Sequence, residues 1–188
     1  MRSVCLASVA VLAMAVPASA AETIDNPQFA MWLKHKKGPS ITLKTTSTGD
    51  ATSETVTTTA LLEVGNDKVV VEMSGSTKIS GMEFKTPPTK REVAKTFELP
   101  EGTKKEDFRE GGKPKGTYEE GTETLKVAGA EYKTKWYKYK VEIGQVKGDA
   151  KLWVCDDVPG TMVKMEMTTV AAGVTSKSTM ELIDFKKP

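Results

Sequence analysis

The chain has 188 residues, of which 38% are hydrophobic and 28% charged, with 27 basic and 25 acidic side chains. This near balance excludes the strong positive field that draws a protein onto nucleic acid. Arginine, the side chain best suited to forked recognition of phosphates and base edges, occurs only at Arg2, Arg91 and Arg109. We therefore predict no role in nucleic-acid binding.

The N-terminal segment has the pattern of a secretory signal peptide. Arg2 supplies a positive charge, an apolar run extends from Leu6 to Val16, and Ala18-Ser19-Ala20 forms a small-x-small triplet. The pattern predicts a signal peptide over residues 1–20, with cleavage after Ala20. The run is shorter than the roughly 20 residues of a membrane span, so no span is expected after cleavage. We predict a secreted or periplasmic protein, and a bacterial cell envelope fits this signal.

Cysteine occurs twice. Cys5 precedes the apolar run of the signal, whereas a lipidated cysteine would follow it, so no lipid anchor is expected. Cys155 is then the single cysteine of the mature chain, which excludes an intramolecular disulfide. The domain expected over residues 21–188 must rely on a hydrophobic core, which its length allows.

A short helix is predicted directly after the signal. Asp25 or Asn26 can cap it, Pro27 suits its first position, and Gly38-Pro39 ends it. Its apolar stripe consists of Phe29, Trp32 and Leu33. The stripe favours a helix that plugs one end of a sheet, and a lid or partner-binding helix is the functional alternative.

From Ser40 onward the apolar pattern has a period of two, which predicts strands rich in β-branched residues. In the first half, Val56, Ala60 and Leu62 share one face, and Gly65-Asn66-Asp67 forms a turn. A strand pair is predicted at Lys78–Lys85 and Glu92–Leu99, on either side of Pro87-Pro88. Residues 99–116 are rich in Gly, Pro and charge and predict a loop.

The second half predicts longer strands with turns about every ten residues. Trp136, Lys138 and Lys140 share one strand face, opposite Tyr137 and Tyr139. The predicted fold class is all-β: a strongly curved antiparallel meander, either a half-barrel or a near-closed barrel, of about ten strands with one short N-terminal helix.

One internal similarity links KISGMEFKT at residues 78–86 to KVAGAEYKT at residues 126–134. Each copy is interpreted as a strand, a glycine able to take positive φ, and a second strand with one aromatic residue. A duplicated unit and convergence on a common hairpin both explain this match.

The sequence carries no convincing catalytic set. Nucleophilic catalysis would need Cys155 with His35 as base, oriented by Asp156 or Asp157, but no local signature surrounds them. Metal-ligand spacing, a phosphate-binding glycine loop and a nucleophile elbow are also missing. We predict no catalytic residues, cofactor or metal. The expected class is a non-enzymatic binding module, and the competing class is an enzyme that uses Cys155 and His35.

An apolar ligand face is the alternative function. If the sheet curves, strand residues of the second half could line a concave face for a lipid-like molecule, because methionine adapts to irregular ligands. These residues are Tyr137, Tyr139, Val141, Val163, Met165 and Met167. A closed core built from the same residues is the other interpretation. The expected partner is an envelope protein or a lipid-like ligand.

Trp153 and the following Asp157-Val158-Pro159-Gly160 predict a structural hairpin that fixes strand register, with Trp153 buried. An exposed Trp153 that anchors a partner is the alternative.

Three segments, NPQFAMWLKHKKGPSITLKT, VAGAEYKTKWYK and LWVCDDVPGTMVKMEM, resemble a group of uncharacterised secreted bacterial β-sheet proteins. The pattern W-x-x-x-D-V-P-G-x-x-V-K, from Trp153 to Lys164, is the most specific part. The C-terminal half is more loosely similar to the half-barrels of lipoprotein carriers. Such carriers place several helices over a lipid-binding face, whereas this sequence predicts one helix.

Overall fold

The computed structural model describes residues 23–49, 51–99 and 113–187. The predicted signal peptide and most of the predicted loop 99–116 lie outside these residues. The elements in chain order are β1 Thr23–Asp25, α1 Pro27–Leu33, β2 Ser40–Thr48, β3 Ser53–Val64, β4 Lys68–Ile79, β5 Met82–Ala94, β6 Thr96–Glu98, β7 Thr117–Val127, β8 Ala130–Ile143, β9 Val146–Val154, β10 Met162–Ala171 and β11 Val174–Lys186.

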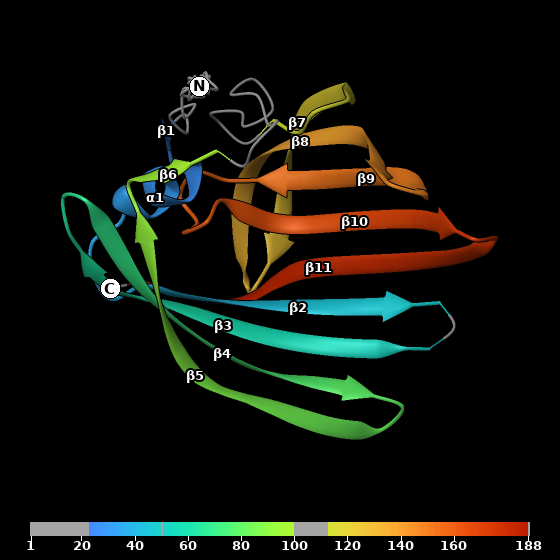
Figure 1. The fold of residues 1–188 in the computed structure, drawn as a ribbon, viewed down its shortest axis with the longest axis horizontal. Coiled ribbons are helices and arrows are strands. Elements are labelled where there is room, and N and C mark those ends of the chain that lie inside the picture. The colour runs from blue at the N-terminus through green and yellow to red at the C-terminus, as the bar shows by residue number, and fades with distance from the viewer. Residues whose placement is uncertain (1–22, 50, 100–112, 188) are drawn as a thin grey trace, which may run out of the picture.

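Nine strands form one antiparallel sheet in the order β5-β4-β3-β2-β11-β10-β9-β8-β7, and β1 pairs with β6 in a separate two-stranded sheet (Figure 1). The predicted antiparallel meander is thus confirmed: two consecutive meanders meet where β2 pairs with β11. The predicted near-closed barrel is not formed in the described part of the chain, because the edge strands β5 and β7 do not pair with each other.

Helix α1 is capped by Asn26, whose side-chain oxygen accepts a 3.0 Å hydrogen bond from the backbone N–H of Gln28. Phe29 and Trp32 are buried, which confirms that the helix packs against the sheet. Leu33 differs from the predicted stripe, being 48% exposed. The helix ends at this residue, five positions before Gly38, and the face turned to the strands carries Phe29 and Trp32.

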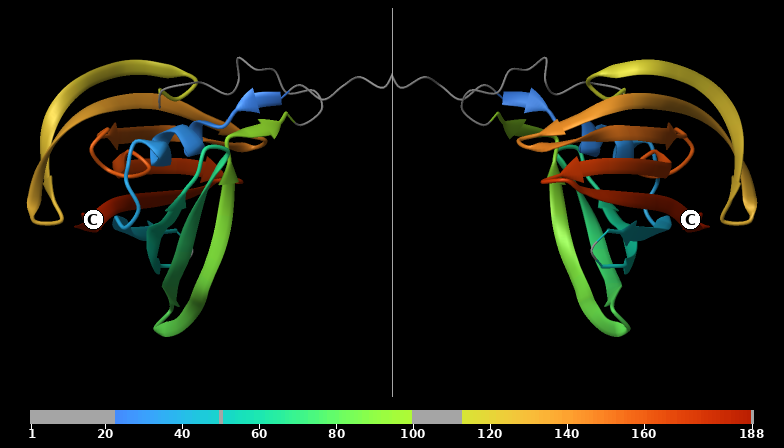
Figure 2. Two further views of the ribbon diagram at one scale, coloured as in Figure 1. Left: turned by 90° about the vertical axis from the view of Figure 1, so that its left-hand side faces the viewer. Right: turned by 90° about the vertical axis from the view of Figure 1, so that its right-hand side faces the viewer.

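The hydrophobic core lies at one end of the large sheet and includes Phe29 and Trp32 of α1. Figure 2 shows how α1 lies against the strands at this end. The buried cluster of the core draws on α1 and on strands from both meanders, and Phe185 packs against it. The cluster comprises Phe29, Trp32, Ile41, Leu61, Val69, Val71, Val93, Val127, Cys155, Val158, Val163 and Leu182. One closed core therefore ties the two meanders together at this end, which we call the core end.

The two strands predicted on either side of Pro87-Pro88 both have wrong bounds. Glu92–Leu99 is divided between β5, which ends at Ala94, and β6 at Thr96–Glu98. Lys78–Lys85 is not one strand, because Ser80-Gly81 forms the turn between β4 and β5. The strand β5 then continues through Pro87-Pro88, where its register with β4 shifts. Proline is tolerated here because β5 is an edge strand and needs ladder hydrogen bonds on one side only.

The predicted apolar face of β3 is also wrong. Leu61, not Leu62, enters the core, at 1% exposure. Threonine occupies both faces of this strand, so the sequence offers little contrast between inward and outward positions. A one-residue error of parity then exchanges the faces.

The two similar segments form equivalent hairpins. Ser80-Gly81 and Ala128-Gly129 both have positive φ at two consecutive residues, as in a two-residue type I′ turn. The cross-strand pairs correspond, with Ile79 opposite Met82 in one and Val127 opposite Ala130 in the other. The shared pattern is therefore the pattern of one hairpin type.

Candidate functional site

The ladder of β8, β9, β10 and β11 brings most of the predicted ligand face together. Tyr137 lies opposite Leu152, Leu152 opposite Met165, and Met165 opposite Met180. In the next row, Ala150 of β9 lies opposite Tyr139 of β8 on one side and Met167 of β10 on the other. Val141 lies two residues further along β8, opposite Gly148. Directly opposed residues share a sheet face. We call this set the apolar face: Tyr137, Tyr139, Val141, Ala150, Leu152, Met165, Met167 and Met180.

A side-chain contact confirms that these rows meet across β9. The hydroxyl of Tyr139 donates to the sulfur of Met165 over 3.8 Å. Burial raises the pKa of the Tyr139 phenol, so the group stays protonated and able to donate at neutral pH.

The six predicted residues differ in accessibility. Val163 has no exposed surface and belongs to the core cluster, and Tyr137 is 9% exposed. Tyr139, Val141, Met165 and Met167 are half-buried. The closed-core interpretation therefore holds for Val163, and Tyr137 is also buried, whereas the other four residues leave part of their surface open to a ligand.

Ala150, Leu152 and Met180 were not among the predicted face residues. Leu152 and Met180 are half-buried, and each pairs directly with Met165. The alternation of apolar and polar residues around Leu152 and Met180 is as clear in the sequence as it is around Met165. Only the strand order shows that β9 and β11 flank β10 and extend the same apolar row.

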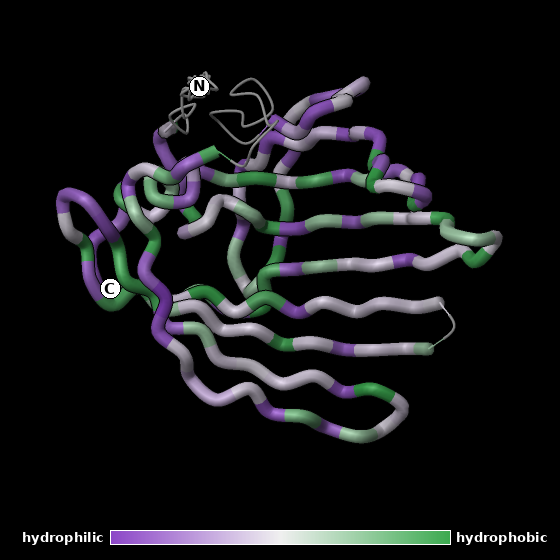
Figure 3. Tube along the Cα trace, viewed as in Figure 1, coloured by the Kyte–Doolittle hydropathy of each residue, from purple (hydrophilic) through white to green (hydrophobic). Residues whose placement is uncertain are grey.

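Hydroxyl side chains take over this face in the first meander. The row of Met165 and Met180 continues through Thr45, Thr55 and Thr77. The hydroxyl oxygens of Thr55 and Thr77 lie 3.1 Å apart, within hydrogen-bonding distance. Figure 3 shows the change, with β2 to β5 pale over much of their length. The apolar face thus has a polar border on one side.

A cavity of about 400 Å³ lies next to α1. Phe29, Met31 and Leu33 line it from the helix, and Val154 lines it from β9. Alternate residues of a strand share a face, so Val154 lies on the same side of β9 as Leu152. No residue of the apolar face is among those that line the cavity, which reaches β9 at Val154, two residues beyond Leu152.

The opposite sheet face carries the two tryptophans. Trp153 is 5% exposed, and its indole N–H donates to the carboxylate of Glu123. The Lys151 ammonium lies 4.3 Å from the Trp153 ring centroid and 4.4 Å from that of Trp136, and it pairs with Glu123 at 3.0 Å. These two hydrogen bonds lower the pKa of Glu123, Trp153 contributing more than Lys151. The predicted burial of Trp153 is confirmed.

The turn after Trp153 is tightly bonded. The backbone N–H of Cys155 donates to Thr161 over 2.7 Å, and the N–H of Thr161 donates to Val158 over 2.7 Å. Val158 and Pro159 are fully buried, and Gly160 has a φ of 75°. Val158 and Pro159 thus pack the segment into the core, and Thr161 also lines the cavity beside α1.

The Cys155 and His35 pair is not assembled as a nucleophile and base. Within the described residues, no hydrogen bond links the imidazole to the thiol, and Nε2 of His35 is buried without a partner. Burial raises the pKa of the Cys155 thiol, and burial together with Lys34 lowers the pKa of His35. Both shifts keep these groups uncharged at neutral pH.

No group of three or more His, Cys, Asp or Glu side chains suited to a metal occurs in residues 23–49, 51–99 and 113–187. In the same ranges, no helix has both the length and the apolar character needed to cross a bilayer.

Comparison with known proteins finds two solved structures to which this chain is similar. One is a protein of Parabacteroides distasonis named as a candidate lipoprotein, with 12% identity and a TM-score of 0.42 over 81% of this chain and 96% of that one. The other is a candidate exported protein with a YmcC-like fold from Bacteroides fragilis, with 10% identity and a TM-score of 0.42 over 81% and 97% of the two chains. No family model and no curated protein matches the chain. At such identities and scores, function has to be argued from this chain's own residues.

Proposed function

We propose that this protein is a non-enzymatic binding protein of the periplasm or cell exterior that carries a lipid-like molecule on its apolar face. We further propose that the large sheet is a half-barrel whose concave side is this face. The observation that carries the proposal is the pair of apolar rows on β8 to β11. Five of their residues are half-buried and lie outside the core cluster: Tyr139, Leu152, Met165, Met167 and Met180.

The composition of the face supports an apolar ligand. Met165, Met167 and Met180 are flexible and polarizable, so they can follow the contour of an acyl chain. The hydroxyl of Tyr139 is engaged with Met165, which leaves few polar groups directed at a ligand. The cavity beside α1 offers a second place for part of an apolar ligand, because its volume of about 400 Å³ falls within the usual range of small-molecule sites, roughly 300–1,000 Å³.

Close strand packing supports the curvature. A Cβ atom at Gly148 would lie 2.1 Å from the carbonyl oxygen of Thr168, so only glycine allows β9 and β10 to approach this closely. Glycines of this kind are typical of bends in curved sheets.

Two further observations support an extracytoplasmic protein without catalysis. Residues 1–20 have the features of a signal peptide. The raised pKa of Cys155 keeps the thiol in its less nucleophilic, protonated form.

The test compares two substitutions on one strand, Met167→Asp on the apolar face and Thr168→Asp on the other face. The protein is purified natively, its organic extract is analysed by mass spectrometry, and binding of an apolar fluorescent dye is titrated. We expect a co-purified lipid and a dye affinity about tenfold weaker in Met167→Asp, because a charge then borders the ligand. Thr168→Asp is expected to match the parent protein.

An empty extract together with equal dye binding by both variants would contradict carriage. A binding module for an envelope protein would then be the better account of this fold.

A further inference from the structure

Large apolar side chains are exposed at one end of the molecule, opposite the core end. Six residues at three hairpin tips are between 38% and 72% exposed. They are Ile79, Met82 and Phe84 on the β4–β5 hairpin, Ile143 on the β8–β9 hairpin, and Val170 and Val174 on the β10–β11 hairpin. Exposure on this scale at one end calls for an explanation.

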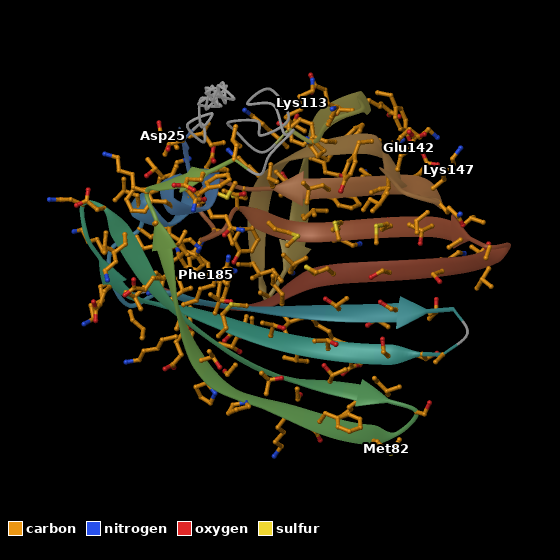
Figure 4. All side chains as sticks on the ribbon, viewed as in Figure 1. Asp25, Met82, Lys113, Glu142, Lys147 and Phe185 are labelled. Atoms are coloured by element: carbon orange, nitrogen blue, oxygen red, sulfur yellow. The ribbon has the colours of Figure 1, made fainter. Side chains whose placement is uncertain are left out.

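The three turns lie at the same end of the sheet. Figure 1 shows the β4–β5, β8–β9 and β10–β11 connections together on the side away from α1. In Figure 4, Met82, Glu142 and Lys147 lie at this end, whereas Phe185 and Asp25 lie at the other. We call this the tip end. Each turn is tight, with positive φ at Gly81, Gly144 and Gly173.

Folding does not account for this exposure. The β7–β8 hairpin has the same turn as the β4–β5 hairpin, but it places its apolar residues in the core, with Val127 at 8% exposure and Leu125 and Tyr132 packed on the cluster. In the β4–β5 hairpin, Met82 is 61% and Phe84 53% exposed. One hairpin type is thus used once for packing and once with its apolar residues presented to the outside.

Lysines lie close behind the tips. Five lie within four residues of the three turns, Lys78, Lys85, Lys140, Lys147 and Lys177, against Glu83, Glu142 and Asp149 of the same hairpins. Within the described chain, the ammonium groups of Lys85 and Lys177 have no carboxylate within ion-pair distance. An apolar tip followed by excess positive charge complements a bilayer interface that contains anionic lipid.

We propose that the tip end docks onto the surface of an anionic bilayer, with the three apolar hairpin tips in the interface and the lysines among the headgroups. Separate projecting tips fit a surface that deforms around each of them, whereas a folded protein partner would offer matched shape. Tight hairpins also satisfy most of their backbone hydrogen bonds internally, as apolar surroundings require.

This proposal goes beyond carriage and stands without it, although the two fit together. β8, β9, β10 and β11 carry the apolar face and end at the β8–β9 and β10–β11 tips. A docked molecule would hold the end of that face against the bilayer, so an apolar ligand could pass between them with little exposure to water.

The test measures flotation of purified protein with vesicles of 70% phosphatidylethanolamine and 30% phosphatidylglycerol, and with pure phosphatidylcholine vesicles. The variants are Met82→Asp and Ile143→Asp at the tips. The matched controls are Ile183→Asp, at a 42% exposed position of β11 away from the tips, and Val64→Asp, at a 39% exposed position near the core end. Thermal unfolding is recorded for all four.

We expect the parent protein and both controls to float with the anionic vesicles. Each tip variant should bind about tenfold more weakly, since it replaces a large apolar side chain by a charge of the same sign as the lipid. A fluorophore attached at Ile143→Cys in a Cys155→Ser background should shift its emission to the blue with these vesicles, and one at Val64→Cys should not.

Equal flotation by tip and control variants, or no flotation of the parent protein, would overturn the proposal. Lipid-free self-association that Met82→Asp abolishes would also overturn it, by showing that the tips bind a second copy. Dye binding separates the two proposals, because Met82→Asp should weaken vesicle binding and keep the dye affinity of the apolar face.

Discussion

At the scale of single residues, Trp153 shows how one side chain joins three strands. Its indole N–H reaches Glu123 on β7, its ring packs under Lys151, and Lys164 of β10 lies 5.3 Å from the ring centroid. A buried indole whose N–H is hydrogen-bonded contributes through both packing and polar satisfaction. The role of Trp153 is therefore structural.

Trp153→Ala is expected to lower the free energy of unfolding by about 3–5 kcal/mol, since it removes a large buried ring. Trp153→Phe should cost less, because it keeps much of the packing and loses the hydrogen bond to Glu123. Urea denaturation followed by circular dichroism measures both. An unchanged midpoint for Trp153→Ala would show that the ring does not support the fold.

His35 makes stability depend on pH in one direction. Its pKa is lowered from 6.5, first by burial and then by Lys34, with Asp157 acting against them. The unfolded chain therefore takes up a proton more readily than the folded one. The free energy of unfolding should fall as pH drops through 6.5 toward the lower folded pKa, and it should carry no such penalty above 6.5.

His35→Gln is expected to remove this component. Between pH 7.5 and 5.5 the free energy of unfolding should fall more in the parent protein than in the variant. The difference should stay well under about 1.4 kcal/mol per pH unit, the limit for one proton, because the His35 ring is only partly shielded from water. Urea midpoints at both pH values test this. Parallel pH profiles would mean that His35 titrates alike in the folded and unfolded states.

At the scale of elements, the segment between β9 and β10 sets how these strands meet. The pairing register of β9 and β10 shifts directly after the turn, between Met162 and Lys164. The turn is closed by its own backbone bonds and buried through Val158 and Pro159. Because β9 and β10 carry the centre of the apolar face, the turn positions Leu152 against Met165.

Gly160→Val is expected to destabilise the protein by roughly 1–2 kcal/mol, the cost of holding a non-glycine residue at positive φ. Space is not the obstacle, as the nearest atom to a Cβ would be Ile41 Cδ1 at 3.8 Å. Gly160→Asn should cost less, since asparagine tolerates this conformation. Equal losses in the two variants, measured by thermal unfolding, would point to packing instead of backbone strain.

At the scale of the whole molecule, stability and surface chemistry are separated along the strands. The core end holds α1 and the buried cluster, whereas the tip end holds exposed apolar hairpins. The long strands connect these ends, and their middle parts carry the apolar face in one meander and threonines in the other. Changes at the tips should therefore leave the fold intact, which is what makes the membrane test interpretable.

The sequence by itself determined the antiparallel β class, the capped helix at Pro27 and the alternation on β8 to β10. These follow from local rules: period-two patterns, cap residues and turn glycines act between near neighbours. The sequence also placed Trp153 correctly in the interior, because a large aromatic ring in the middle of an alternating strand, next to a Pro-Gly turn, favours burial.

Only the tertiary structure decided the rest. Leu152 and Met180 joined the apolar face because β9 and β11 lie beside β10, and strand order depends on contacts distant in sequence. Val163 entered the core because the start of β10 lies at the core end of the sheet, and Leu61 entered it on a strand where threonines on both faces hide the parity. The contrast between the β4–β5 and β7–β8 hairpins also depends on the tertiary structure. Two nearly identical segments form the same hairpin, and the position of each in the sheet decides whether its apolar residues are buried or exposed.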